Sequence, residues 1–288
     1  MQFLDVKTDY AFKKVFGSSE SKAILISFLN GIIYSQSSQY IDDLTIVDPY
    51  NIPMIKGVKD TFVDVKAVLN DKTQVIIEMQ VLNHKGFEKR VLYNAAKNYS
   101  IQLNKREDYH LLNPVIALNI VDFMMFEETS VVSNFKLLEK EQFIHYNDDI
   151  ELIFVELPKF TKTLTELETI EDQWIFFLRN AGSLEAIPES LDNTIQSALQ
   201  IVNEANMSKE ELEAQHKRKE FIYIQKNSVE LAEETGMEKG MEKGIEQGIE
   251  KGIKQEKMDS AIKMKAKGYD IDDIIEITGL SKEEIDSL

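Results

Sequence analysis

The stretch TFVDVKAVLNDKTQVIIEMQV, residues 61–81, carries the clearest structural pattern in the chain. Apolar side chains occupy nearly every odd position of 61–69 and of 75–81, which is the period-two alternation of strands that bury one face. The residues between them, Asn70–Asp71–Lys72, form a good turn sequence. The stretch therefore predicts an antiparallel hairpin with its apolar side on a core.

The turn length fixes the expected register of this hairpin. A three-residue loop pairs Leu69 with Thr73, and counting back sets Asp64 opposite Glu78. Directly opposed residues have Cβ atoms ~5 Å apart, so the two carboxylates would meet on the polar face. A two-residue loop would place them on opposite faces and contradict the apolar pattern.

Two facing carboxylates are a candidate site for a hard divalent cation. Magnesium takes oxygen ligands and often only one or two protein carboxylates, with waters completing its shell. Gln80 lies on the same face as Glu78 and can donate to a water or a phosphate oxygen, but it cannot act as a base. The alternative is an ordinary solvated sheet face, which needs no function.

The flanking sequence alternates helical and extended patterns, which predicts an α/β fold. Apolar spacing predicts helices, with Trp174 in the core, and β-branched runs predict strands. The expected helices are 8–17, 21–33, 86–105 and 166–180; the expected strands are 44–53, closed by a proline-containing turn, 61–69, 75–81, 111–126 and 150–160. Residues 189–235 are expected to be polar, Glu-rich helix.

Composition excludes several classes of protein. The chain has no cysteine, and its four histidines are far apart in sequence, so Cys-ligated metal sites and a His cluster are not expected. There is no long apolar run, and the N-terminus is acidic where a signal peptide is basic, so we expect a cytoplasmic protein without a membrane span.

The net charge of −17 is unevenly distributed. Residues 1–128 hold 14 Lys and Arg against 16 Asp and Glu, whereas residues 129–288 hold 19 against 34. Charge therefore argues against nucleic-acid binding by the second half, while the first half can still carry a local basic groove.

The C-terminal part begins with an unusual repeat. Glycine recurs every fourth residue from Gly236 to Gly252, each followed by Met or Ile. Each glycine costs a helix ~1 kcal/mol, so the repeat is a poor isolated helix. It is either a flexible linker or a packing seam for a partner.

The segment after the repeat predicts a small three-helix unit. Gly268 ends its first helix, Asp270 caps the second, and Ser281 with Glu284 forms a capping box for the third. The spacing is typical of a helix-turn-helix, but the acidic excess favours protein interaction or dimerisation over DNA contact.

Motifs along the first 180 residues resemble the PD-(D/E)XK nuclease/transposase family, including the recombination-promoting Rpn nucleases. The matching segments are TDYAFKKVFG (8–17), ISFLNGII (26–33), DVKA (64–67), IIEMQ (76–80), RVLYNAAKNYS (90–100), NPVIALNI (113–120), VELPKF (155–160) and WIFFL (174–178). The resemblance implies an αβββαβ core with a metal-dependent phosphodiesterase site that uses Mg²⁺ or Mn²⁺.

On the family pattern, Asp64 matches the metal-binding aspartate and Glu78 the acidic residue of the (D/E)-x-K motif. Gln80 falls where most of the superfamily has lysine, and this branch commonly shows E-x-Q. Asp9 matches a position where related nucleases often have a third carboxylate; a helix N-terminal charge is the alternative. The resemblance thus implies catalytic roles for these four residues, with Asp64 and Glu78 as metal ligands.

Four basic residues are candidate DNA contacts. Lys13 and Lys14 follow Asp9 on the first helix, where solvated surface is the alternative. Arg90 and Tyr93 lie early in the helix that follows the site strands, where the fold places substrate contacts. For Arg90 the alternative is a structural ion pair. Lys66 lies one step from Asp64 on the same strand face, so it is a candidate substitute for the missing lysine.

The resulting hypothesis is a DNA endonuclease linked to recombination, mobile-element processing or defence against foreign DNA. The alternative is a binding or interaction module with a degenerate site. We expect a nuclease domain over 1–180, a helical extension over 181–235, the repeat over 236–254 and a helical tail over 255–288. The tail is expected to form a homodimer or, alternatively, to mimic DNA and cover the site.

Overall fold

The computed structural model describes residues 1–35, 37–51 and 61–288. The proline-containing turn expected after residue 51 lies outside these residues. The chain divides into two compact units, Met1–Tyr223 and Ile224–Leu288. Each unit is described by itself.

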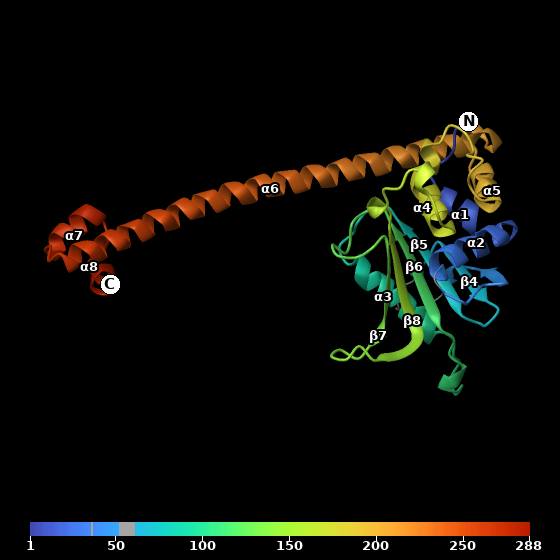
Figure 1. Cartoon of the computed structure of the whole chain (residues 1–288), viewed down its shortest axis with the longest axis horizontal. Helices are drawn as coiled ribbons and strands as arrows, with labels where there is room; N and C mark the ends of the chain where they lie inside the picture. The colour runs from blue at the N-terminus through green and yellow to red at the C-terminus, as the bar shows by residue number, and fades with distance from the viewer. Residues whose placement is uncertain (36, 52–60) are drawn as a thin grey trace. The chain divides into compact units, whose positions relative to one another are not determined.

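A mixed sheet forms the middle of the first unit (Figure 1). Its strands, in spatial order, are β1 (Leu44–Val47), β4 (Val65–Leu69), β5 (Gln74–Gln80), β6 (Val115–Val121), β8 (His145–Glu156) and β7 (Val132–Leu138). The β1–β4, β4–β5 and β7–β8 pairs are antiparallel, whereas β5–β6 and β6–β8 are parallel. A separate two-stranded pair joins β2 (Tyr50–Asn51) to β3 (Thr61–Phe62).

The β4–β5 hairpin has the predicted register. Ala67 pairs with Val75, and the Leu69 N–H donates to the Thr73 carbonyl oxygen at 2.9 Å across the three-residue loop. The prediction of one continuous strand over 61–69 is wrong, because β3 and β4 are separate. The ladder stops at Val65, since the Asp64 N–H donates to the carbonyl of Ile77, which already pairs with Val65.

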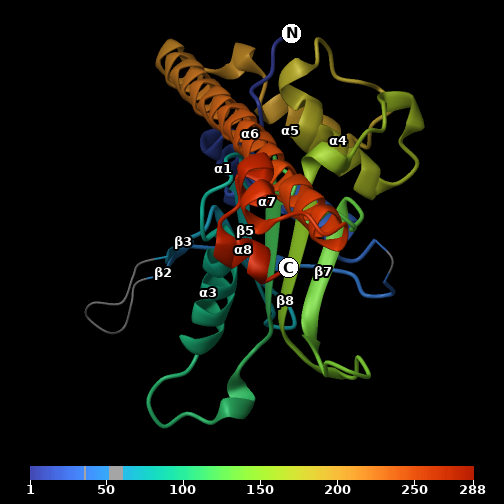
Figure 2. The ribbon, with the colours of Figure 1, turned by 90° about the vertical axis from the view of Figure 1, so that its left-hand side faces the viewer.

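The two faces of the sheet are covered by different helices (Figures 1 and 2). Odd-numbered residues of β5 enter a large core with α1 (Asp9–Phe16), α2 (Lys22–Ile33), α4 (Ile170–Asn180) and α5 (Asn193–Ile201). Ile76 on the opposite face packs with Ala95 of α3 (Phe87–Ser100). The polar face of β5 therefore lies on the α3 side. Short 3-10 turns occupy Ser19–Ser21, Tyr109–Leu111, Leu157–Lys159, Leu164–Glu166, Ala181–Ser183 and Glu204–Asn206.

Aromatic rings fill the larger core. Trp174 is fully buried, as predicted, with its ring centroid 5.5 Å from that of Phe28 and 5.6 Å from that of Phe177. Its indole N–H donates to the Ser27 hydroxyl at 3.2 Å, so the polar atom is satisfied. Trp174 is the single tryptophan of the chain, which makes its fluorescence a reporter of this unit.

Several element boundaries differ from the predictions. The helix expected from residue 166 begins at Ile170, because Thr169 and Asp172 form a capping box there. The helix expected over 86–105 ends at Ser100. Strand β7 was not predicted, because its solvent-exposed edge position leaves no clear apolar alternation in the sequence.

The second unit begins within α6 (Lys209–Ala266) and ends with α7 (Ile271–Thr278) and α8 (Lys282–Asp286). The predicted caps of α7 and α8 are confirmed: Asp270 caps α7, Gly279 ends it with a φ of 67°, and Ser281 forms the box with Glu284. Ala261, Ile274, Leu280 and Ile285 form the small core of this unit.

The glycine repeat lies inside α6 and is helical throughout. At each of its five glycines, a Cβ would meet no atom within 4 Å. The repeat therefore has no packing partner among the described residues of this chain. No helix in the described part of the chain is long and apolar enough to cross a membrane.

Candidate active site

Asp64 stands at the break between β3 and β4, and the break turns its side chain toward β5. Its Oδ2 accepts a hydrogen bond from the Met79 backbone N–H at 2.8 Å, and only 16% of the side chain is exposed. Burial raises the pKa of Asp64 to about 7, with a contribution from the hydrogen bond and charge of Asp9. This environment therefore favours the protonated form of the Asp64 carboxyl over its charged form.

Asp9 reaches the same point from the first turn of α1. The Asp9 and Asp64 carboxyls interact, which contributes to the lowered pKa of Asp9 and to the raised pKa of Asp64. Burial acts to raise the pKa of Asp9, but hydrogen bonds from Lys13 and Asp64 outweigh it, so that pKa is lowered. The Lys13 Nζ lies 2.7 Å from Asp9 Oδ1 and 3.5 Å from Asp64 Oδ1. Lys13 therefore sits between the two acids.

Glu78 lies on the α3 side of β5, next to Met79. Arg90 of α3 donates from one Nη to the carboxylate of Glu78 and, at 2.7 Å, to Gln80 Oε1. Burial raises the pKa of Glu78 and outweighs the charge of Arg90 and the hydrogen bond with Asn94. The Gln80 amide donates to the Leu82 carbonyl at 2.6 Å, which fixes its orientation.

The side of α3 that faces the sheet is lined by polar residues at helical spacing. Arg90, Asn94 and Asn98 are four residues apart, and the two asparagines are buried. Asn98 Oδ1 accepts from Lys66 Nζ at 2.8 Å. Lys66 is therefore bound to α3, whereas Arg90 is the cation that contacts Gln80. Burial lowers the pKa of Lys66.

The structure gives Lys14 a different environment from Lys13. Its Nζ lies 3.1 Å from the Tyr10 hydroxyl and 3.3 Å from Glu211 Oε1, in a network that joins α1 to α6. Tyr93 is an exposed residue of α3. Neither side chain contacts Asp64 or Glu78 through an interaction recorded in the described residues.

Two residues of the neighbourhood, Asn94 and Asp122, were not anticipated. Asp122 follows β6, its N–H donates to the Gln80 carbonyl at 3.0 Å, and its side chain pairs with Lys7 at 3.3 Å. The signal for Asp122 was a carboxylate directly after a buried strand. The sequence feature that could have identified Asn94 was its i, i+4 spacing from Arg90. This spacing places a side-chain amide on the helix face that carries the apolar Val91.

The donor set suits a small hard cation that needs few protein ligands. Asp64, directly before β4, and Glu78, on β5, supply carboxylate oxygens, and burial raises the pKa of both. In residues 1–35, 37–51 and 61–288, no three His, Cys, Asp or Glu side chains converge as a ready-made ligand set. Magnesium commonly binds through one or two carboxylates and keeps its waters, so the two acids fit that ion.

Comparison with known proteins supports a nuclease ancestry. Residues 6–232 match the family model for the PD-(D/E)XK nuclease family transposases. The match extends from the segment before α1 into α6, so it includes every site residue named above. No curated protein and no solved structure gives a significant match.

Proposed function

We propose that this chain, which belongs to the PD-(D/E)XK nuclease family transposases, is a magnesium-dependent DNA endonuclease whose active site is built on Asp64 and Glu78. The observation that carries the proposal is the hydrogen bond from Met79 N–H to Asp64 Oδ2, 2.8 Å long. It ties Asp64 to the residue that follows Glu78, and we propose that the two acids share one ion.

The order of elements supports a nuclease core of the αβββαβ kind. Helix α2 is followed by β1, β4 and β5, then by α3 and β6. We propose that these elements are that core, with β2–β3 as an insertion and β7–β8 as an extension of the sheet. On this assignment Asp64 directly precedes the second core strand, and Glu78 lies on the third.

Within the proposed site, Asp64 and Glu78 would hold the ion, and Asp9 would accept a hydrogen bond from the attacking water. A bound magnesium ion supplies neutralisation of the phosphate and a more acidic water. Asp9 is suited to this role because its hydrogen bond with Lys13 acts to lower its pKa. Lys13, beside both acids, would contact a phosphate oxygen.

Arg90 would supply the positive charge that Gln80 lacks. A lysine at the third motif position normally faces the reacting phosphate, and glutamine carries no charge. Here the guanidinium lies against Gln80 Oε1 and Glu78, whereas Lys66 is hydrogen-bonded to Asn98. We therefore assign the compensating cation to Arg90 rather than to Lys66. The biological setting that fits such an enzyme is recombination, mobile-element processing or defence against foreign DNA.

Isothermal titration calorimetry with Mg²⁺ and Mn²⁺ tests the proposed site without any assumption about the substrate. We expect saturable binding by the wild type, and its loss in Asp64→Ala and in Glu78→Ala. Asp42→Ala, which removes an exposed carboxylate, is the matched control. If metal binding survives both site substitutions, the ion binds at another site. If the folded wild type binds no metal, the nuclease site is degenerate.

A further inference from the structure

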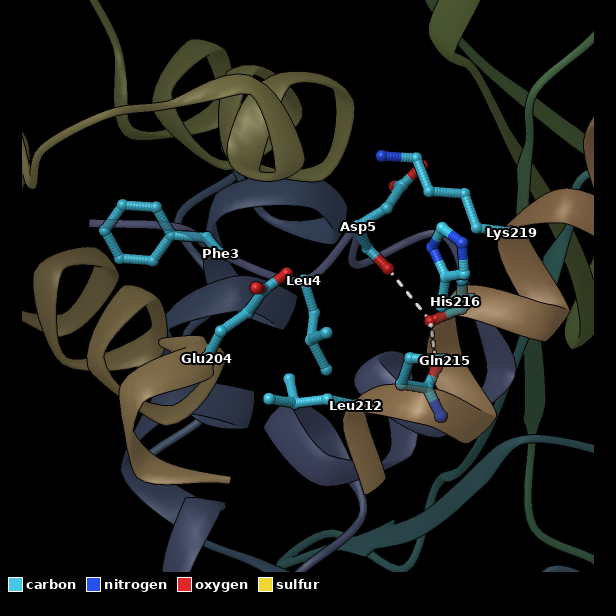
Figure 3. A pocket seen from close by; sticks show the side chains of 9 residues that line it. Phe3, Leu4, Asp5, Glu204, Leu212, Gln215, His216 and Lys219 are labelled. Atoms are coloured by element: carbon cyan, nitrogen blue, oxygen red, sulfur yellow. Dashed lines mark hydrogen bonds between the residues drawn. The ribbon is translucent and has the colours of Figure 1, made fainter. Parts of the chain in front are cut away.

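The start of α6 packs against α1 through one side of the helix. Glu211 accepts hydrogen bonds from the Tyr10 hydroxyl and from Lys14 Nζ. One turn later, Gln215 Oε1 accepts from the Thr8 hydroxyl at 3.2 Å, and Figure 3 shows Gln215 directed toward this segment. The first turns of α6 are thereby fixed beside the N-terminus of α1, where Asp9 begins the helix.

Arg218 continues this side of α6 by one more turn. Glu211, Gln215 and Arg218 have the i, i+4, i+7 spacing of a single helix face. Gln215 contacts Thr8, the neighbour of Asp9, and Arg218 lies less than one turn further along the same side of α6. The charge of Arg218 is close enough to contribute to the lowered pKa of Asp9.

Arg218 differs from the other cations around the site. Lys13 pairs with Asp9, Arg90 with Glu78, and Lys7 with Asp122. Within the described parts of the chain, no carboxylate lies within 4.0 Å of the Arg218 guanidinium, which rests over the Phe221 ring at 5.7 Å. The side chain is exposed, so its donors remain available to an incoming group.

We propose that Arg218 binds a backbone phosphate of the nucleic acid that enters the active site. This inference rests on the proposed nuclease function and names a substrate contact outside the sheet and α1. A guanidinium matches two phosphate oxygens with paired N–H donors. Stacking on Phe221 orients the guanidinium without using its donors. The location of Arg218 in an otherwise acidic second half of the chain also gives DNA a positive point of approach beside Asp9.

The test measures binding separately from cleavage. A fluorescein-labelled DNA duplex is titrated with full-length protein in EDTA, where no metal-dependent cutting occurs, at several KCl concentrations. Arg218→Ala is compared with Lys217→Ala, which removes the same charge from the adjacent position. Lys217 pairs with Glu213 at 2.7 Å and is not on the face of α6 defined by Glu211 and Gln215.

We expect Arg218→Ala to raise the dissociation constant roughly tenfold and to lower the slope of log K against log salt by about one phosphate contact. Arg218→Lys should recover part of the affinity, and Lys217→Ala should stay within about twofold of wild type. Equal losses in Arg218→Ala and Lys217→Ala, or no loss in either, would overturn the contact. If the wild type cleaves DNA with metal but Arg218→Ala binds DNA as tightly as the wild type, the nuclease function stands and the Arg218 contact is wrong. If the wild type binds no DNA, both the nuclease function and the Arg218 contact are wrong.

Discussion

The substitution Asp64→Asn should stabilise the metal-free protein at neutral and alkaline pH, although it removes a proposed metal ligand. Asparagine reproduces the protonated form of Asp64: its oxygen can accept from Met79 N–H, and its amide can donate to Asp9. The substitution therefore removes the cost of ionising a buried carboxyl without removing its hydrogen bonds.

The size of the effect follows from the pKa of Asp64. Its rise from 3.8 to about 7 corresponds to ~4 kcal/mol, at 1.36 kcal/mol for each tenfold change in proton affinity. We therefore expect a gain of up to ~4 kcal/mol in the free energy of unfolding at pH 8.

The sign of the pH dependence is fixed by the raised pKa. Well below pH 4, Asp64 is protonated in the folded and unfolded states, so wild type and Asp64→Asn should be equally stable. Between pH 4 and 7 the unfolded chain releases the proton while the folded chain keeps it, so the wild type loses stability as pH rises. Above pH 7 the difference between the two proteins should be constant.

Urea unfolding followed by Trp174 fluorescence measures this difference in the first unit alone, since Trp174 lies in that unit's core. Asp42→Asn, at an exposed position, is the control and should show no pH-dependent gain. Added Mg²⁺ should stabilise the wild type and leave Asp64→Asn unchanged. A variant that is less stable than wild type at pH 8 in EDTA would refute the argument.

Three further predictions concern α3, the glycine repeat and the tail. Arg90→Ala should lower the free energy of unfolding by about 2 kcal/mol in urea titrations, because Glu78 loses its counter-charge; unchanged stability would contradict the ion pair's role. Gly240→Ala and Gly244→Ala should each stabilise α6 by ~1 kcal/mol, seen as a higher melting temperature in circular dichroism, because an added Cβ meets nothing within 4 Å; a lower melting temperature would indicate a partner packed on the glycines. Deletion of 236–288 should change the oligomeric state in light scattering, as the expected homodimer requires; equal subunit numbers would refute it.

The hairpin could be predicted from sequence because its information is local. The apolar alternation and the turn residues fix the register of β4 and β5, and the structure has that register. The caps of α7 and α8 are equally local, and they were predicted residue by residue. Membership of the nuclease family was also predicted from short motifs and is confirmed by the match over 6–232.

The partners of the charged residues could not be predicted in the same way. Whether Arg90 or Lys66 would reach Gln80 depends on how α3 crosses the sheet, which no local pattern specifies. Likewise, the approach of Arg218 to Asp9 joins residues more than two hundred positions apart in sequence. The break between β3 and β4 was not predicted, because the apolar alternation of the sequence continues through it although the strand pairing stops.

Plasmid cleavage by the purified full-length protein shows whether Asp64 and Glu78 form a metal-dependent nuclease site. Supercoiled DNA is incubated with Mg²⁺, Mn²⁺ or EDTA, and wild type is compared with Asp64→Ala, Glu78→Ala and the control Asp42→Ala. We predict nicking or linearisation that requires metal, persists in the control and is lost in both site variants. Cleavage that survives both site substitutions, or a folded wild type that cuts with neither metal, would contradict the account.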